Sequence, residues 1–201
     1  MKYDAEKREV ICKKELNNLD RFVLDFVDIL KDYVIVSGYV SILFGRSRAT
    51  EDVDLLIPKM DRNEFGGLWK DLIAKGFECV NTSNMEEAFD FLGEHAIRFF
   101  RKTPVPNIEF KLIKTDLDKY SYENKIKVVL NEKFIFVSPL EMQIAYKLFL
   151  AADGTDEKLR PDKDIEDARH LYKVFEDKLN KEELLAFVKK LNVGKRLRLL
   201  K

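Results

Sequence analysis

The sequence predicts a mixed α/β (α+β) fold, with an α/β domain over residues 1–137 and a helical region over residues 138–201. Short apolar runs bounded by turn residues indicate strands in the first part, and amphipathic stretches between them indicate helices. After residue 137 the apolar residues recur with a helical period alone. A chain of 201 residues that is 46% hydrophobic can bury a sizeable core, so we expect the two parts to pack as one compact unit. The expected sheet is small, mixed and flanked by helices.

The first elements surround a glycine. Residues 12–32 read as an amphipathic N-terminal helix with apolar residues at three- and four-residue steps. "YVIVSG" is a short buried strand that breaks at Ser37 and Gly38, and "YVSILFG" continues as a helical segment that ends near Gly45. "EDVDLLIP" is a second strand, closed by proline.

The middle of the chain alternates between helix and strand. We expect helices over residues 61–75 and 85–92, with "FECV" as a strand between them. "HAIRFFRK" and "NIEFKLIK" are predicted to be neighbouring strands separated by a turn in "TPVPN". "KIKVVL" and "KFIFVS" then form a hairpin about Asn131.

The remaining residues are predicted to be helical. The helices cover residues 139–152, 161–176 and 181–190, with a last turn in "KRLRLL". Ser138 before Pro139 is a plausible N-cap, and Pro161 marks the start of the next helix.

Composition and charge exclude several classes of protein. No apolar run approaches the roughly 20 residues of a membrane span, so we expect no membrane association. The N-terminus is charged throughout and does not resemble a signal peptide, which favours a cytoplasmic location. Thirty-six basic and 36 acidic residues cancel, which argues against coating nucleic acid by bulk charge. The 36% charged content is typical of a thermophile.

The soft metal ligands are few. Two cysteines, Cys12 and Cys79, and two histidines, His95 and His170, stand far apart, so we expect reduced cysteines and neither a disulfide framework nor a zinc site. A carboxylate-bound Mg²⁺ ion is the metal to consider.

Two aspartates interrupt an apolar strand. On a strand, Asp52 and Asp54 project to the same side, and two ionised carboxylates in proximity need a positive partner. A pair of divalent ions meets that need, and Glu109, on the polar side of the "NIEFKLIK" strand, would complete the set of three ligands. The alternatives are a turn or capping role for the aspartates and a solvated edge position for Glu109.

A pair of small residues precedes these acids. Ser37 and Gly38 end a strand and open a helix, a geometry in which backbone N–H groups can face a phosphate. The alternative is an ordinary tight turn.

These residues together resemble a known family. "SGYVSILFGRSRATEDVDLLI" is similar to the signature of the polymerase-beta-like minimal nucleotidyltransferases, and specifically of the AbiEii-type abortive-infection toxins. The resemblance implies a nucleotidyltransferase fold, with Ser37 and Gly38 as the phosphate-binding pair. It implies Arg48 and Thr50 as an Arg-x-Thr motif at the nucleotide, and Asp52 and Asp54 as metal ligands. Serine stands at position 37, where the family usually has glycine.

The resemblance extends into the helical part. "PLEMQIAYKLFLAADGTDEKLRPDKDIEDARHL" is similar to the family's lysine-containing helix and its Lys-Asp-x-x-Asp segment. It implies nucleotide-binding roles for Lys163 and Asp167, and an active-site role for Asp164, which would orient Lys147 or the acceptor hydroxyl. Helical spacing also places Lys147 beside an inward apolar stripe, which favours a triphosphate clamp over a side chain that snorkels to solvent. The alternative for the two acids is stabilisation of a helix N-terminus, worth about 0.3–1 kcal/mol each.

The resulting functional prediction is a metal-dependent nucleotidyltransferase that moves an NMP from an NTP to a hydroxyl acceptor. Mg²⁺ is the expected cofactor in a two-metal site, with Mn²⁺ as the alternative. The resemblance implies an RNA end, such as that of tRNA, or a protein as acceptor, and a toxin role with an antitoxin as partner. The alternative, a catalytically inactive nucleotide-binding module that serves as a sensor or partner protein, rests on serine at position 37.

Overall fold

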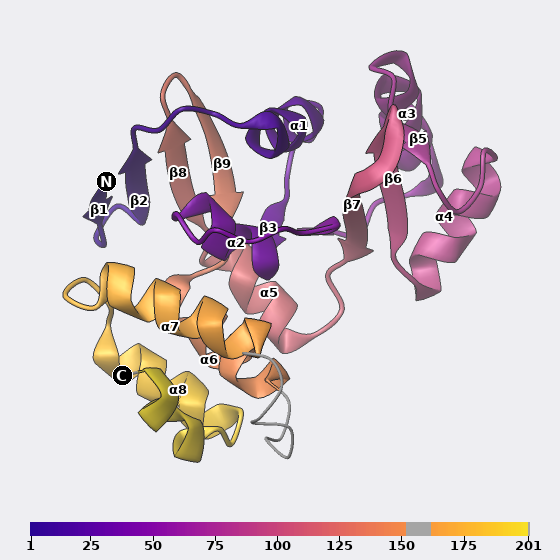
Figure 1. Ribbon diagram of the computed structural model, residues 1–201. Coiled ribbons are helices and arrows are strands. Elements are labelled where there is room, and N and C mark those ends of the chain that lie inside the picture. Colours follow the sequence, from indigo (N-terminus) through magenta and orange to yellow (C-terminus); the bar gives the residue numbers. More distant parts are fainter. Residues whose placement is uncertain (152–161, 201) are drawn as a thin grey trace.

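The computed structural model describes residues 1–151 and 162–200 (Figure 1). Within them, one mixed sheet has the strand order β1-β2-β8-β9-β3-β4-β7-β6-β5. The strands are β1 (Lys2–Asp4), β2 (Glu9–Cys12), β3 (Val34–Val36), β4 (Asp52–Ile57), β5 (Glu78–Cys79), β6 (Ile97–Arg101), β7 (Thr103–Leu112), β8 (Ile126–Leu130) and β9 (Lys133–Val137). The helices are α1 (Asn18–Val27), α2 (Gly38–Leu43), α3 (Arg62–Ala74), α4 (Met85–Glu94), α5 (Asp116–Glu123), α6 (Leu140–Leu150), α7 (Lys163–Phe175), α8 (Lys181–Lys190) and the 3-10 helix η1 (Gly194–Leu200).

The centre of the sheet positions the acidic residues. β3 and β4 are antiparallel, whereas β4 and β7 are parallel. In this register Asp52 lies opposite Asn107, and Asp54 lies opposite Glu109. Because directly opposite residues of neighbouring strands project to the same face, β4 and β7 present their polar side chains together.

The opposite face of these strands is the hydrophobic core. Val53, Leu55 and Ile57 are fully or almost fully buried and alternate with the acidic residues along β4. Phe26 of α1 packs edge-on against Phe110 of β7, with ring centroids 6.0 Å apart. This apolar layer fixes which face of the sheet carries the carboxylates, because a one-residue slip would bury them.

The C-terminal helices form a group of their own, visible in Figure 1 as the orange to yellow part of the chain beside the sheet. α6 packs against α7 and α8, and α7 also contacts α2. α5 lies against β3 and β4. These contacts confirm a mixed α/β part followed by a helical part. No helix in the described part of the chain is long and apolar enough to cross a membrane.

The N-terminal helix is shorter than predicted. The prediction of a helix over residues 12–32 was wrong at both ends, since α1 begins at Asn18 and ends at Val27. Residues before it form β1 and β2, and β2 pairs in parallel with the distant β8. Local periodicity does not reveal a strand whose partner lies more than 100 residues away.

Three smaller corrections concern turns and caps. "TPVPN" is not a turn, because β7 already starts at Thr103 and the chain turns at Lys102, whose φ is 69°. α5 was missed, although Thr115 and Asp118 form a capping box at its start. Ser138 is not an N-cap, since its hydroxyl donates instead to Gln143. The predicted helix start at Pro161 lies outside the described residues.

Candidate functional site

The acidic residues of β4 and β7 surround a lysine. Lys111 Nζ lies 2.8 Å from Asp54 Oδ1 and 3.1 Å from Glu109 Oε1. Arg98, from β6, places Nη2 3.4 Å from the same Glu109 oxygen. Burial alone would lower the pKa of Lys111, but Asp54 and then Glu109 raise it above its ordinary value. Two cations of the chain therefore balance the two carboxylates.

Asp52 lies one step along the same face. Thr50 Oγ1 donates to the Asp52 carbonyl at 2.8 Å, which fixes the start of β4. Asn107, opposite Asp52, has its side-chain oxygen buried with no hydrogen-bond partner among the described residues. Its amide nitrogen donates to the carbonyl of Glu51 at 3.0 Å. A free buried acceptor beside a carboxylate is a suitable oxygen ligand for a cation.

The donor set fits Mg²⁺ by its chemistry. Asp52, Asp54 and Glu109 offer hard carboxylate oxygens from one face of two adjacent strands, as the ion prefers. In residues 1–151 and 162–200, however, no group of three or more His, Cys, Asp or Glu side chains is close enough to hold a metal ion. The two-metal site stays a prediction.

Ser37 has an unusual backbone, held by Gln143 from α6. Its φ of 65° and ψ of −136° are rare for a non-glycine residue and are more easily adopted by glycine. Gln143 accepts from the Ser37 N–H at 3.2 Å and donates to the Ser37 carbonyl at 2.8 Å. Ser138 donates to the Gln143 side-chain oxygen at 2.8 Å. The turn before α2 is therefore fixed, and its first N–H is already used.

A second charged cluster lies between α6, α7 and the loop after α2. Asp167 is fully buried and accepts from Arg48 Nε and Nη2, both at 3.0 Å, and from Arg46. Lys147 Nζ lies 3.0 Å from Asp167 Oδ2, the oxygen that also accepts from Arg48 Nη2. Burial by itself raises the pKa of Asp167, but Lys147 and Arg48 outweigh this effect and lower the pKa below its usual range.

Lys147 is buried among acids and does not reach solvent. Its side chain is 2% exposed, and Nζ lies 2.6 Å from Asp164 Oδ1 as well as beside Asp167. The snorkelling alternative is therefore wrong. Asp164 contacts Lys147, and its active-site role stays a prediction. Lys163 is exposed at the start of α7, where its carbonyl accepts from Arg46. The structure brings Lys147, Asp164 and Asp167 together but leaves Lys163 at their margin.

Gly38 and Arg48 connect the two clusters. A Cβ atom added at Gly38 would lie 2.1 Å from Arg48 Nη2, so the guanidinium rests directly on the first residue of α2. On the other side, Val36 of β3 lies opposite Asp54 in β4. The Ser37–Gly38 turn thus stands between the carboxylates and the buried ion pairs.

This contact predicts the effect of a methyl group at Gly38. Gly38→Ala should lower the free energy of unfolding by about 1–3 kcal/mol, because Arg48 must give up its paired contacts with Asp167. In an Arg48→Ala background the same change should be neutral or mildly stabilising, since alanine favours a helix over glycine by about 1 kcal/mol. Urea denaturation of the unchanged protein, the two single variants and the double variant measures the coupling free energy between Gly38→Ala and Arg48→Ala. Equal costs of Gly38→Ala in both backgrounds would contradict it.

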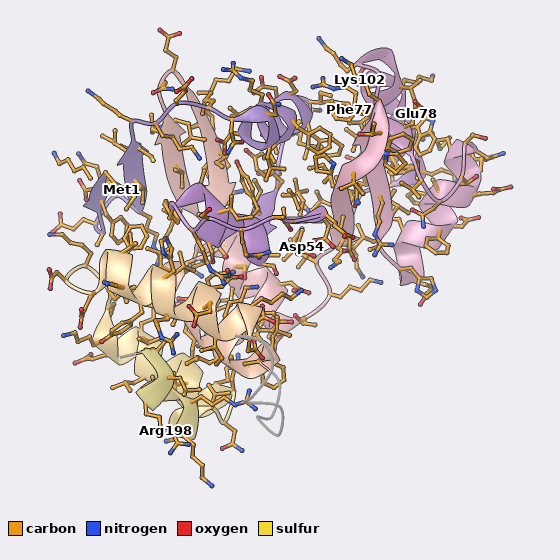
Figure 2. All side chains as sticks on the ribbon, viewed as in Figure 1. Met1, Asp54, Phe77, Glu78, Lys102 and Arg198 are labelled. Atoms are coloured by element: carbon orange, nitrogen blue, oxygen red, sulfur yellow. The ribbon has the colours of Figure 1, made fainter. Side chains whose placement is uncertain are left out.

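A cavity of about 600 Å³ opens beside Asp54. Ser37, Asp54 and Lys111 line one part of it, and Gln143, Leu117 and Tyr146 from α6 and α5 line another. This volume lies within the range of small-molecule sites in proteins. Figure 2 shows Asp54 near the middle of the view, between the strands β5 to β7 and the C-terminal helices.

The sequence pattern does not reveal the contacts that hold the expected site in place. Strand alternation predicts Lys111, two residues after Glu109, on the same face, but it does not reveal that Lys111 pairs with Asp54 of β4. Arg98 lies directly opposite Glu109 in the β6–β7 pair, which requires knowledge of the register. No local signal identifies Gln143 as the partner of Ser37, because 106 residues separate them.

Comparisons with known proteins agree on the fold. No protein-family model and no curated protein sequence matches the chain. Among solved structures, the chain is similar to an antigenic nucleotidyltransferase-like protein from Paracoccidioides brasiliensis, with a TM-score of 0.54 and 18% identity over 89% of this chain and 90% of that one. It is also similar to the antibiotic-resistance factor ANT(2'')-Ia, with a TM-score of 0.55 and 13% identity over 89% of this chain and 93% of that one. The chain therefore has a nucleotidyltransferase fold.

Proposed function

We propose that this protein transfers a nucleotidyl group from an NTP to a hydroxyl acceptor. The observation that carries the proposal is the pair of carboxylates, Asp54 and Glu109, on adjacent parallel strands beside the Ser37–Gly38 turn and a cavity of about 600 Å³. The nucleotidyltransferase fold of the chain supports the same reaction class.

The reaction forms one bond and breaks one bond at the α-phosphorus. The acceptor oxygen attacks this atom, the bond to the oxygen that bridges the α- and β-phosphates breaks, and pyrophosphate leaves. The hydroxyl proton passes to a carboxylate of β4 or β7. When bound, Mg²⁺ would neutralise phosphate oxygens and activate the attacking hydroxyl.

The buried charged cluster supplies a favourable field for the triphosphate. Three cations (Arg46, Arg48 and Lys147) face two carboxylates (Asp164 and Asp167), which leaves one net positive charge beside the Ser37–Gly38 turn. In this account Asp164 and Asp167 orient the cations. Preorganised charges of this kind stabilise charge that develops in a transition state.

The acceptor and the biological role follow the resemblance to AbiEii-type toxins. We propose a hydroxyl of an RNA end, such as that of tRNA, or of a protein as the acceptor, in the cytoplasm. An antitoxin would then be the natural partner of the chain. We propose that Lys163, which is exposed at the start of α7, contacts the nucleotide at the margin of the site.

The direct test offers labelled substrate to the purified protein. Each of the four α-labelled NTPs is incubated with the protein, Mg²⁺ and total tRNA, and with the protein alone. We expect label to appear on RNA or on protein with at least one NTP. Absence of transfer with every NTP and both acceptor classes would contradict the proposal.

A second candidate function is nucleotide binding without turnover. Serine at position 37, with its backbone N–H already bonded to Gln143, favours this candidate because one expected phosphate donor is occupied. An NTP that raises the melting temperature while no label moves would support this function, since a ligand that binds the folded state stabilises it.

A further inference from the structure

We infer that Lys111 is an internal counter-cation that occupies the place of a divalent ion and must be displaced before a metal binds. This inference rests on the proposed function, because it concerns the same pair of carboxylates. Lys111 is a positioning residue in this account: it acts through Asp54 and Glu109, and its ammonium sets how readily they accept a metal.

The geometry places one ammonium between two carboxylates. Nζ of Lys111 lies 2.8 Å from Asp54 Oδ1 and 3.1 Å from Glu109 Oε1, and the two acids are directly opposite each other on β4 and β7. A metal ion that bridged these acids would need the same two oxygens. The lysine and the ion therefore compete for one position.

Partial burial makes a cation necessary at this point. The side chains of Asp54 and Glu109 are 18% and 14% exposed, so water screens their mutual repulsion only in part. Arg98 touches Glu109 alone, at 3.4 Å, and is 44% exposed. Among the residues that the structure describes, Lys111 is the cation that contacts both acids. Its ammonium holds the two carboxylates together in the absence of metal.

The lysine also has room to leave. Its ammonium sits at the end of a flexible four-carbon stem, unlike the planar head of an arginine. Lys111 and Asp54 both line the cavity beside the sheet, so a displaced ammonium can enter the cavity without disturbing the core. Displacement therefore needs a side-chain rotation and no movement of β7.

The charge balance sets the size of the effect. The side chains of Lys111, Arg98, Asp54 and Glu109 together carry no net charge. Without Lys111, the remaining three carry one net negative charge. One unit charge about 4 Å from a divalent ion changes its affinity by about 30-fold at the dielectric constant of water, and by more at the lower effective value near a protein surface. Removal of Lys111 should tighten metal binding by this factor.

The test measures Mn²⁺ binding, by electron paramagnetic resonance of the free ion, on the full-length protein without nucleotide. Lys111→Met and Lys111→Gln should bind Mn²⁺ more tightly than the unchanged protein, by about 30-fold or more. Lys111→Arg, which keeps the charge, should retain weak binding. Lys111→Met combined with Asp54→Asn should lose the gain, because one of the two negative charges that attract the ion is gone. Lys111→Gln serves where the methionine variant does not fold.

Equal or weaker Mn²⁺ binding by both neutral variants would overturn the inference, as would tight binding by the arginine variant. The outcome is separable from that of the proposed function. Label transfer by the unchanged protein together with unaltered Mn²⁺ affinity in the variants overturns the role of Lys111 alone. Tighter Mn²⁺ binding in the variants without any label transfer supports the role of Lys111 and contradicts the transferase.

Discussion

Replacement of Asp54 by asparagine is expected to reduce nucleotidyl transfer by about 10³-fold, the order of magnitude for loss of a preorganised charge at a reacting centre. Three observations single out Asp54: it lies opposite Glu109 in the sheet, it lines the cavity, and its carboxylate forms an ion pair with Lys111. The change removes a charge and keeps the shape. The rate of label transfer at saturating NTP measures the effect.

The fold should survive this substitution. The Asp54–Lys111 pair is partly exposed, and pairs of this kind contribute about 0–1 kcal/mol. Glu78→Gln is a matched control, because Glu78 is exposed on the edge strand β5 and lies away from Asp54 in Figure 2. A folded Asp54→Asn protein that transfers label as fast as the Glu78→Gln control would contradict the assignment.

Replacement of Asp167 by asparagine is expected to lower the free energy of unfolding by about 3–5 kcal/mol at pH 7, as for other buried ion pairs that lose one partner. Asp167 is fully buried and contacts Arg46, Arg48 and Lys147. Without its charge, three cations face Asp164 alone. Chemical denaturation of the two proteins measures the difference.

The difference should depend on pH in a defined direction. The folded-state pKa of Asp167 is lowered, so its carboxylate contributes fully above the ordinary aspartate pKa of about 3.9 and loses this contribution as the pH falls through the lower folded value. The difference in the free energy of unfolding between the unchanged protein and Asp167→Asn should be constant from pH 7 to about pH 5 and should decrease below about pH 4. A difference in the free energy of unfolding that increases as the pH falls would contradict the stabilising role of the Asp167 ion pairs.

Local sequence signals predicted the strands and helices whose ends are marked by residues close by in the sequence. The strand at residues 52–57 alternates and stops before Pro58, and the helix at residues 62–74 ends before Gly76, whose φ is 77°. These features depend on neighbours in sequence. The sequence alone therefore predicts where these elements end.

Long-range pairing hid the rest of the sheet. β2 is four residues long and gains its stability from β8, and the start of β7 at Thr103 depends on its pairing with β6. Pro104 and Pro106 are turn-forming residues locally, yet both belong to β7. A proline in a strand is tolerated where no ladder hydrogen bond is needed, which the sequence does not reveal.

For the candidate site, the sequence predicted the acids but not the ion pairs and hydrogen bonds that they and Ser37 make. Asp54 and Glu109 were expected on one face, and the β4–β7 register confirms that placement. Lys111 and Arg98 neutralise these acids and Gln143 holds Ser37, but these roles follow from distances of 2.8–3.4 Å between side chains and backbone of different strands and helices. Balanced charge is a property of the assembled face and not of one segment.

The most direct test of the central claim compares two positions of the label in one NTP. With the NTP and acceptor found by the transfer assay, nucleotidyl transfer predicts that α-label joins the acceptor while γ-label leaves as pyrophosphate. Asp54→Asn should stop both events together. Acceptors that carry γ-label and no α-label would show that the protein transfers a phosphoryl group, and would contradict the account.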